Sequence, residues 1–267
     1  MSDLTGTSYP LIRAIDNKLT STPTTLPPLG PHDVLLKITH SGVCFTDYEF
    51  HRFAPLALGH EGVGTVIAIG SSVTTLSIGD RAGGGFHRDS CGTCRYCLTG
   101  RDILCDSRTL YGLGDFDNGT FGTYFVGKEG HVHKIPEGMS SADAAPLQCA
   151  GATVYAALTE TVKYGDRVGV IGIGGLGHLA VQFARKMGAE VVVFSTSKDK
   201  EEEARGFGAS EFVLLGEMEK VSRPVDVVIL TANKYPDWGR LMDKGVLARG
   251  GTVVPLAAPT HGPISLP

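Results

Sequence analysis

The strongest constraint on the fold is a glycine-rich loop between an apolar strand and a helix. The loop reads GIGGLG, with Gly172, Gly174 and Gly177 in the G-x-G-x-x-G spacing; an apolar run over 167–173 precedes it and a helical pattern over 176–188 follows. In this context the motif predicts a dinucleotide-binding turn, because its glycines permit a tight turn, close approach of a pyrophosphate, and helix–strand packing. The free N–H groups at the start of the helix favour phosphate there. The residues that we expect at the phosphates are Gly172, Gly174, Gly175, Leu176 and Gly177.

Strands and helices alternate after residue 150. Helical patterns follow the first two of these strands, and the predicted strands cover 167–173, 190–195, 211–216, 225–230 and 250–257. Alternation of this kind predicts an α/β fold with a doubly wound parallel sheet, here a Rossmann domain over 151–267.

The first part of the chain has a different rhythm. Short β-rich runs over 33–43, 62–70, 122–127 and 130–138 are separated by turn residues, which predicts a small β-barrel domain over 1–150. A helix is expected over 140–158, with Ser140 or Ser141 as its N-cap.

The end of the second Rossmann strand indicates which dinucleotide binds. An NAD site usually has an acidic residue there, whereas this chain has FSTSKDK. The hydroxyls of Ser195 and Thr196 and the cations of Lys198 and Lys200 suit a 2′-phosphate, so we expect NADP(H). The alternative is that these lysines are the solvated start of a helix.

Composition limits the partners and the compartment. Hydrophobic residues make up 42% and charged residues 19% of the chain, and the formal charge is −4, so neither nucleic acid nor an anionic membrane is an expected partner. The first residues lack a secretory pattern and no apolar run reaches the roughly 20 residues of a membrane span, so a cytoplasmic protein is expected. In a reducing compartment the six cysteines are not expected to form disulfides.

Four of the cysteines stand close together in a lobe of about residues 85–110. Their spacing is C-x2-C-x2-C-x7-C, formed by Cys91, Cys94, Cys97 and Cys105. Four thiolates satisfy a tetrahedral zinc ion completely, which is typical of a structural site. An iron–sulfur cluster is the alternative, but the x3-C-P continuation of the ferredoxin motif is missing.

The other two cysteines predict a second metal site. Cys44 and Cys149, together with His60, provide the Cys2His set of a catalytic zinc ion that keeps one position open. Asp47 is expected to orient the His60 ring, and Glu61 to act as a neighbouring or transient ligand. Taken singly, each residue is more often an ordinary core residue.

These motifs together resemble one family. The chain resembles the zinc-dependent medium-chain alcohol dehydrogenases, most closely an NADP-dependent, fungal-type branch near the cinnamyl-alcohol dehydrogenases. The segments that carry the resemblance are GVCFTD, GHEGVG, the four-cysteine lobe, AAPLQCAGATVY, GVIGIGGLGHLAVQFARKMG and FSTSKDKEEEA. The resemblance implies a GroES-like catalytic domain, a Rossmann domain, an active site between them, two Zn2+ per chain, NADP(H), and an alcohol or aldehyde substrate.

The resemblance also implies residue roles. Cys44, His60 and Cys149 would bind the catalytic zinc, Thr46 would contact the substrate oxygen and begin a proton relay, and Thr153 would lie against the nicotinamide. Ser195, Thr196 and Lys200 match the positions that hold the 2′-phosphate in NADP-using relatives.

Two positions near Cys44 depart from the family pattern. Phe45 stands where relatives often carry His, Arg or Gly, which removes a possible contact with the pyrophosphate. Glu49 occupies the position of the relay histidine, and His51 is the nearest histidine. The relay is therefore expected to end at His51 through a shifted loop, at Glu49, or at water.

The chain stops at GPISLP, after the fifth predicted strand, whereas the family continues with a sixth strand and a return into the catalytic domain. We therefore expect a C-terminally truncated relative with an incomplete Rossmann domain and an unpaired sheet edge, and such edges invite association. The family's homodimer would be weakened by loss of that strand. Two functions follow as expectations: an alcohol dehydrogenase, or an impaired relative that binds NADP(H) and zinc without useful turnover.

Overall fold

The computed structural model describes residues 4–52, 55–243 and 245–257. It divides into two compact units, Met1–Cys149 and Ala150–Pro267. No helix among the described residues is long and apolar enough to cross a membrane.

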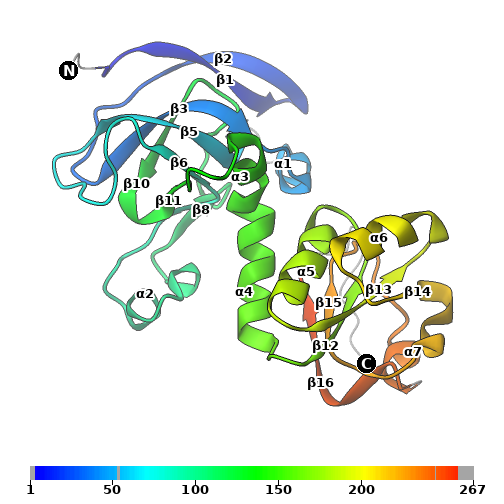
Figure 1. Ribbon diagram of the computed structural model, residues 1–267. Helices are drawn as coiled ribbons and strands as arrows, with labels where there is room; N and C mark the ends of the chain where they lie inside the picture. The colour runs from blue at the N-terminus through cyan, green and yellow to red at the C-terminus, as the bar shows by residue number, and fades with distance from the viewer. Residues whose placement is uncertain (1–3, 53–54, 244, 258–267) are drawn as a thin grey trace. The chain divides into compact units, whose positions relative to one another are not determined.

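The first unit is built on a five-stranded antiparallel sheet (Figure 1). The strand order is β10-β3-β5-β6-β11, with bounds Tyr124–Lys128, Asp33–Ser41, Glu61–Ile69, Arg81–Gly85 and Val132–Lys134. Alternate apolar residues of these strands are buried, among them Val34, Leu36, Val66 and Phe125, and they form a common core. Burial of one face of the sheet holds the strands in this register.

Smaller elements of the first unit surround this sheet. A second sheet joins β2 (Lys18–Thr25), β1 (Ser8–Ile15) and β4 (Leu56–Ala57). A third joins β7 (His87–Asp89), β8 (Thr109–Tyr111) and β9 (Gly114–Asp115). The short helical elements are α1 (Phe45–Phe50), α2 (Arg95–Leu98), η1 (Asp102–Leu104) and η2 (Glu129–His131).

The helix expected over 140–158 is interrupted. Helix α3 (Ser141–Pro146) begins after Ser140, whose hydroxyl accepts a hydrogen bond from the Asp143 N–H. A π-helical turn, Leu147–Gly151, then leads into α4 (Ala152–Thr161). Pro146 lacks an N–H group, and π turns often mark functional positions; here the turn carries Cys149.

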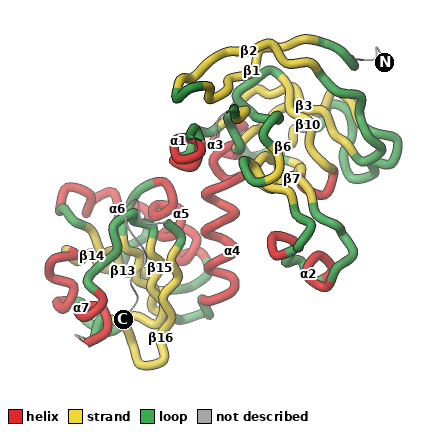
Figure 2. Tube along the Cα trace, turned by 180° about the vertical axis from the view of Figure 1, so that it is seen from behind, coloured by secondary structure: helices red, strands yellow, loops and turns green. Residues whose placement is uncertain are grey.

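The second unit is a five-stranded parallel sheet, which confirms the predicted fold class (Figure 2). Its order is β14-β13-β12-β15-β16, with bounds Glu211–Leu214, Glu190–Ser195, Arg167–Ile171, Val225–Leu230 and Leu247–Pro255. Besides α4, the helices among its described residues are α5 (Gly175–Lys186), α6 (Glu201–Phe207) and α7 (Trp238–Asp243), with two 3-10 segments at η4 (Lys198–Lys200) and η5 (Leu215–Lys220).

The strand order reverses between β12 and β15, and ligands of such sheets bind at the carboxyl ends of the strands near this point. The last strand begins at Leu247, three residues earlier than expected, and pairs with β15. The terminal segment GPISLP lies outside the described residues.

Candidate metal centres and dinucleotide site

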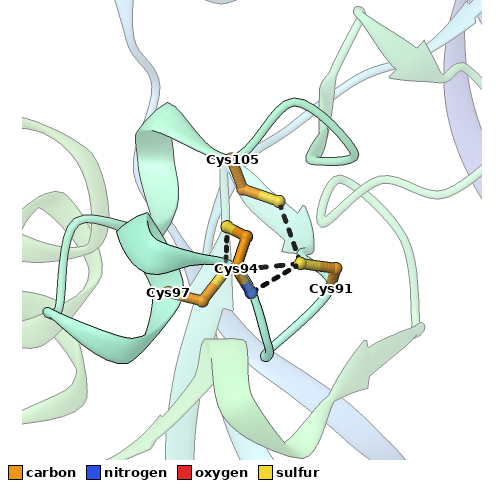
Figure 3. A group of neighbouring side chains, drawn as sticks. All are labelled: Cys91, Cys94, Cys97 and Cys105. Atoms are coloured by element: carbon orange, nitrogen blue, oxygen red, sulfur yellow. Dashed lines mark hydrogen bonds between the residues drawn. The ribbon is translucent and has the colours of Figure 1, made fainter.

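The four cysteines of the lobe converge on one point (Figure 3). Their sulfur atoms are separated by 3.5 Å between Cys105 and Cys91, 3.6 Å between Cys94 and Cys97, and 3.9 Å between Cys91 and Cys97. A tetrahedral zinc ion with Zn–S bonds of about 2.3 Å would place its ligand sulfurs about 3.8 Å apart. The two sulfurs of a disulfide, by contrast, are only about 2.05 Å apart. The free thiols therefore fit a tetrahedral metal and exclude a disulfide arrangement.

Two glycines and backbone N–H groups shape this lobe. Gly92 and Gly100 have φ values of +68° and +71°, a conformation that other residues rarely adopt. The N–H of Cys94 donates to the Cys91 sulfur at 3.3 Å. Backbone donors at Thr93 and Cys94 lower the pKa of Cys91 to about 6, which favours the thiolate that a metal requires.

A second group of potential ligands lies in the same unit. Cys44, His60, Glu61 and Cys149 each offer a ligand atom within 4.8 Å of the others. Cys44 is the N-cap of α1, and Cys149 lies in the π-helical turn. Glu61 is the first residue of β5, and His60 immediately precedes it. The sulfurs of Cys44 and Cys149 are 4.0 Å apart.

The His60 ring is held in one orientation. Its Nδ1 lies 2.9 Å from Asp47 Oδ1, while its Nε2 is buried and has no hydrogen-bond partner among the described residues. A buried polar atom without a partner costs free energy unless something binds it, so Nε2 is suited to a metal ion. The contact that we expected between Asp47 and His60 is present.

Asp47 is itself fixed by further donors. The N–H groups of Cys44 and Gly59 donate to its carboxylate at 3.0 and 3.2 Å. The hydroxyl of Tyr111 donates to Oδ1 at 2.9 Å, and the Tyr111 ring stacks on His60 with centroids 4.7 Å apart. The sequence interpretation missed Tyr111, because nothing in its local sequence marks it and 64 residues separate it from Asp47.

The interaction between the two thiols shifts their pKa values in opposite directions. A hydrogen bond from Cys149 lowers the pKa of Cys44 to about 3, and the same interaction together with burial raises the pKa of Cys149. Burial, and then the neighbouring Cys44 thiolate, raise the pKa of Glu61 to about 7. A bound metal cation would lower the pKa of Cys149 as well, because both cysteines bind metal as thiolates.

The other residues expected near Cys44 lie outside the group of potential metal ligands. Thr46 is half-buried and hydrogen-bonds to the Cys44 sulfur. His51 Nδ1 contacts the Tyr48 carbonyl oxygen, and Glu49 pairs with Arg52, so neither residue belongs to the ligand group. Phe45 is the first residue of α1 and is half exposed, with its ring centroid 5.4 Å from that of Tyr48.

The glycine loop has the geometry expected of a phosphate-binding turn. Gly172 has a φ of +96°, and a Cβ on Gly177 would lie 2.0 Å from the Gly172 carbonyl oxygen. By contrast, a Cβ on Gly174 or Gly175 would meet no atom within 4 Å. The open space in front of Gly174 and Gly175, just before Leu176 at the start of α5, fits a pyrophosphate group.

Three of the four residues expected at the 2′-phosphate lie beside this loop, whereas Lys198 does not line the pocket formed there. Ser195, Thr196 and Lys200 line a pocket of ≈ 400 Å³ that also includes Gly172. The ammonium of Lys200 donates to the Ile173 carbonyl oxygen at 3.0 Å. The other two cations of the pocket, which the sequence interpretation missed, are Lys234 and Arg240.

Thr153 is an exposed residue of α4, in the second unit.

Two thiolate-rich ligand groups in one unit and a dinucleotide turn in the other define a class of protein, the metal-dependent dehydrogenases. Comparison with known families agrees with this class. Residues 30–137 match the model of the alcohol dehydrogenase GroES-like domain, and residues 175–267 match that of the zinc-binding dehydrogenases.

Individual relatives extend the match. A probable formaldehyde dehydrogenase of Bacillus subtilis is 38% identical over 247 residues, which cover 86% of this chain and 70% of the relative. An NADP-dependent alcohol dehydrogenase C of Mycolicibacterium smegmatis is 35% identical over 266 residues, covering 93% of this chain and 75% of the relative. The chain therefore belongs to the zinc-dependent medium-chain alcohol dehydrogenase family, as its motifs predicted.

Solved structures show the same fold. A cinnamyl alcohol dehydrogenase from Sorghum bicolor has a TM-score of 0.88 and 32% identity, covering 97% of this chain and 79% of that one. A structure of CAD from Helicobacter pylori complexed with NADP(H) has a TM-score of 0.85 and 27% identity, covering 94% and 76%.

Proposed function

We propose that the chain is an NADP(H)-dependent alcohol dehydrogenase that interconverts alcohols and aldehydes, with one catalytic and one structural zinc ion. The observation that carries the proposal is the buried, unpartnered Nε2 of His60 beside the thiols of Cys44 and Cys149. When bound, zinc polarises the substrate oxygen and NADP(H) exchanges the hydride.

The chain's own side chains have distinct tasks in this proposal. Cys44, His60 and Cys149 hold the catalytic metal, and Glu61 is the additional oxygen donor within 4.8 Å. Asp47 keeps the His60 proton on Nδ1 and so leaves Nε2 available. The Thr46 hydroxyl, which hydrogen-bonds to the Cys44 sulfur, accepts a hydrogen bond from the substrate alcohol and passes a proton on to water as it takes one up.

The structural zinc belongs in the four-cysteine lobe, where the sulfur separations match a tetrahedral ion. All four protein ligands are supplied there, so this ion has no position left for substrate.

The cofactor assignment rests on the glycine loop and the end of β13. The N–H groups at the start of α5 receive the pyrophosphate. Ser195, Thr196 and Lys200 hold the 2′-phosphate, because they offer hydroxyls and a cation where an NAD site would carry an acid.

The first experiment measures metal and turnover together. We expect two zinc ions per purified chain and NADPH consumption with an aromatic aldehyde. Cys149→Ala should lose one zinc ion and nearly all turnover, whereas Ser21→Ala, at an exposed site on β2, should retain both. Tight NADPH binding without turnover of any carbonyl compound would indicate the impaired relative instead.

The second experiment tests the cofactor preference. Lys200→Ala should weaken NADPH binding about tenfold and NADH binding little, because it removes one charge-assisted contact with the 2′-phosphate. Ser195→Asp should weaken NADPH still more through repulsion. Lys186→Ala, at the far end of α5, is the control. A parent protein that prefers NADH would contradict the assignment.

A further inference from the structure

A third group of potential metal ligands lies apart from the two cysteine sites. His87 on β7, Asp102 on η1 and His131 on η2 each offer one ligand atom, and these atoms lie within 4.8 Å of one another. The group shares no residue with the other two, and neither the family motifs nor the catalytic proposal uses it.

Both imidazole rings turn the same nitrogen toward one carboxylate oxygen. Asp102 Oδ2 lies 3.2 Å from His87 Nδ1 and 3.7 Å from His131 Nδ1. The second separation exceeds a hydrogen bond, so Asp102 does not simply bridge the two rings. Tetrahedral ligands about 2.0–2.1 Å from a metal lie about 3.4 Å apart, between the two observed distances.

The surroundings of the two rings differ. The outer nitrogen of His131, Nε2, lies 3.3 Å from the Ser90 hydroxyl, which fixes the ring with Nδ1 toward Asp102. The other nitrogen of His87, Nε2, is buried without a hydrogen-bond partner among the described residues. Burial lowers the pKa of both histidines.

Charge and access also suit a cation. The Asp102 side chain is 37% exposed, so water can complete the coordination shell from that side. Asp89 adds negative charge near His87, whereas Arg108 opposes it. The Arg108 guanidinium is engaged with the Cys105 carbonyl oxygen at 3.1 Å.

We propose that His87, Asp102 and His131 form a third metal site, which binds a divalent transition-metal ion such as Zn2+ with two imidazoles and one carboxylate. Imidazole and carboxylate ligands with open positions favour zinc and its neighbours over calcium or magnesium. The site joins η2 to both ends of the cysteine lobe, since His87 precedes Cys91 and Asp102 precedes Cys105. A bound ion would therefore clamp the base of the lobe.

The test counts zinc on the full chain without a histidine tag. Protein already loaded with zinc is dialysed against rising free Zn2+, and bound metal is measured by mass spectrometry. We expect one further zinc ion per chain, bound at least about tenfold more weakly by Asp102→Asn and by His131→Gln. His133→Gln is the matched control, because His133 is exposed on β11 two residues away.

Nuclear magnetic resonance of the unsubstituted chain provides a second measurement, which does not depend on the variants folding. Added Zn2+ should shift the ring 15N signals of His87 and His131 and leave those of His133 in place. Unmoved signals, or equal zinc binding by the parent and both ligand variants, would overturn the proposal. Because the added zinc is counted beyond the cysteine sites, its absence would leave the catalytic proposal standing.

Discussion

Tyr111 supports the candidate catalytic metal without touching the ligand sulfurs. Its hydroxyl donates to Asp47, and burial followed by the Asp47 charge raises its pKa, so the phenol remains a donor at all ordinary pH values. Tyr111→Phe keeps the ring on His60 but removes that bond. We expect about tenfold weaker zinc binding at the catalytic site and lower kcat, because such supporting bonds typically matter by 10–100-fold.

Competition with a chromogenic chelator measures this change. Tyr155→Phe is the matched control, since the Tyr155 side chain is largely exposed on α4. Equal zinc affinity in the Tyr111→Phe protein and its parent would show that Asp47 needs no support from the phenol.

The residues near Cys44 show what sequence can predict at this scale. Cys44, His60 and Cys149 were predicted as a group from residue type and family spacing, and the structure brings them together with Glu61. Tyr111 could not be found in this way, because its contact with Asp47 depends on how β8 packs near α1. The relay beyond Thr46 is likewise undetermined by spacing, since His51 and Glu49 are engaged with their own helix neighbours.

At the scale of elements, Gly177 sets how closely α5 approaches the glycine loop. A Cβ on Gly177 would lie 2.0 Å from the Gly172 carbonyl oxygen. This oxygen belongs to the backbone, so it cannot move aside as the end of a flexible side chain could. Gly177→Ala should lower the free energy of unfolding by about 2 kcal/mol and reduce NADPH affinity, because α5 must shift. Urea denaturation and cofactor titration measure the two effects.

Gly206→Ala is the control for this substitution. Gly206 lies within α6, has no atom within 4 Å of its Cβ position, and has no positive φ. Alanine should stabilise that helix by about 0.5–1 kcal/mol. Destabilisation by both substitutions would show that the close contact at Gly177 is not the cause.

Arg167 ties the amino ends of the parallel strands together. Its side chain is 4% exposed; Nε donates to Glu190 at 3.0 Å, and Nη2 donates to the Ser222 hydroxyl at 3.0 Å and pairs with Glu211. Arg167→Met should cost about 2 kcal/mol, less than for a fully buried pair because both carboxylates are partly exposed.

The same network predicts a pH dependence. Burial alone would raise the pKa of Glu211, but hydrogen bonds from Ser222 and the Arg167 charge outweigh it and lower the pKa. The ionised carboxylate therefore contributes stability above its ordinary pKa of about 4.3, and this is lost as the pH falls through the lower folded value. The loss of stability on acidification should be smaller in the Arg167→Met protein than in its parent. Acid denaturation curves of the two proteins measure this difference, and the same dependence of stability on pH in both would contradict the prediction.

Element boundaries were predictable where one physical signal dominated. The strands predicted over 190–195 and 225–230 have the same bounds in the structure, because continuous apolar runs bounded by turn residues mark both ends. The region 140–158 was less predictable, since its helical pattern continues through Pro146 while the backbone opens into a π turn. That local departure places Cys149 among the metal ligands.

At the scale of the whole molecule, metal ligands and cofactor residues are divided between the two units. The residues of all three candidate metal sites lie in Met1–Cys149, and the glycine loop and its pocket lie in Ala150–Pro267. The division between a β-rich part and an alternating part was visible in the sequence. The proposed third metal site was not, because no motif in the sequence marks His87, Asp102 and His131 as a group.

This division predicts that metal removal and cofactor binding act on different segments. Helix α2 and the η1 segment have no buried residues, so the cysteine lobe depends on its metal rather than on an apolar core. Chelation should therefore raise hydrogen–deuterium exchange in residues 91–105, whereas NADPH should lower exchange in 171–200. Mass spectrometry of peptic peptides measures both, with β3 as an internal reference because its first four residues are buried. Equal deprotection of 171–200 on chelation would contradict the prediction, since no proposed zinc ligand lies there.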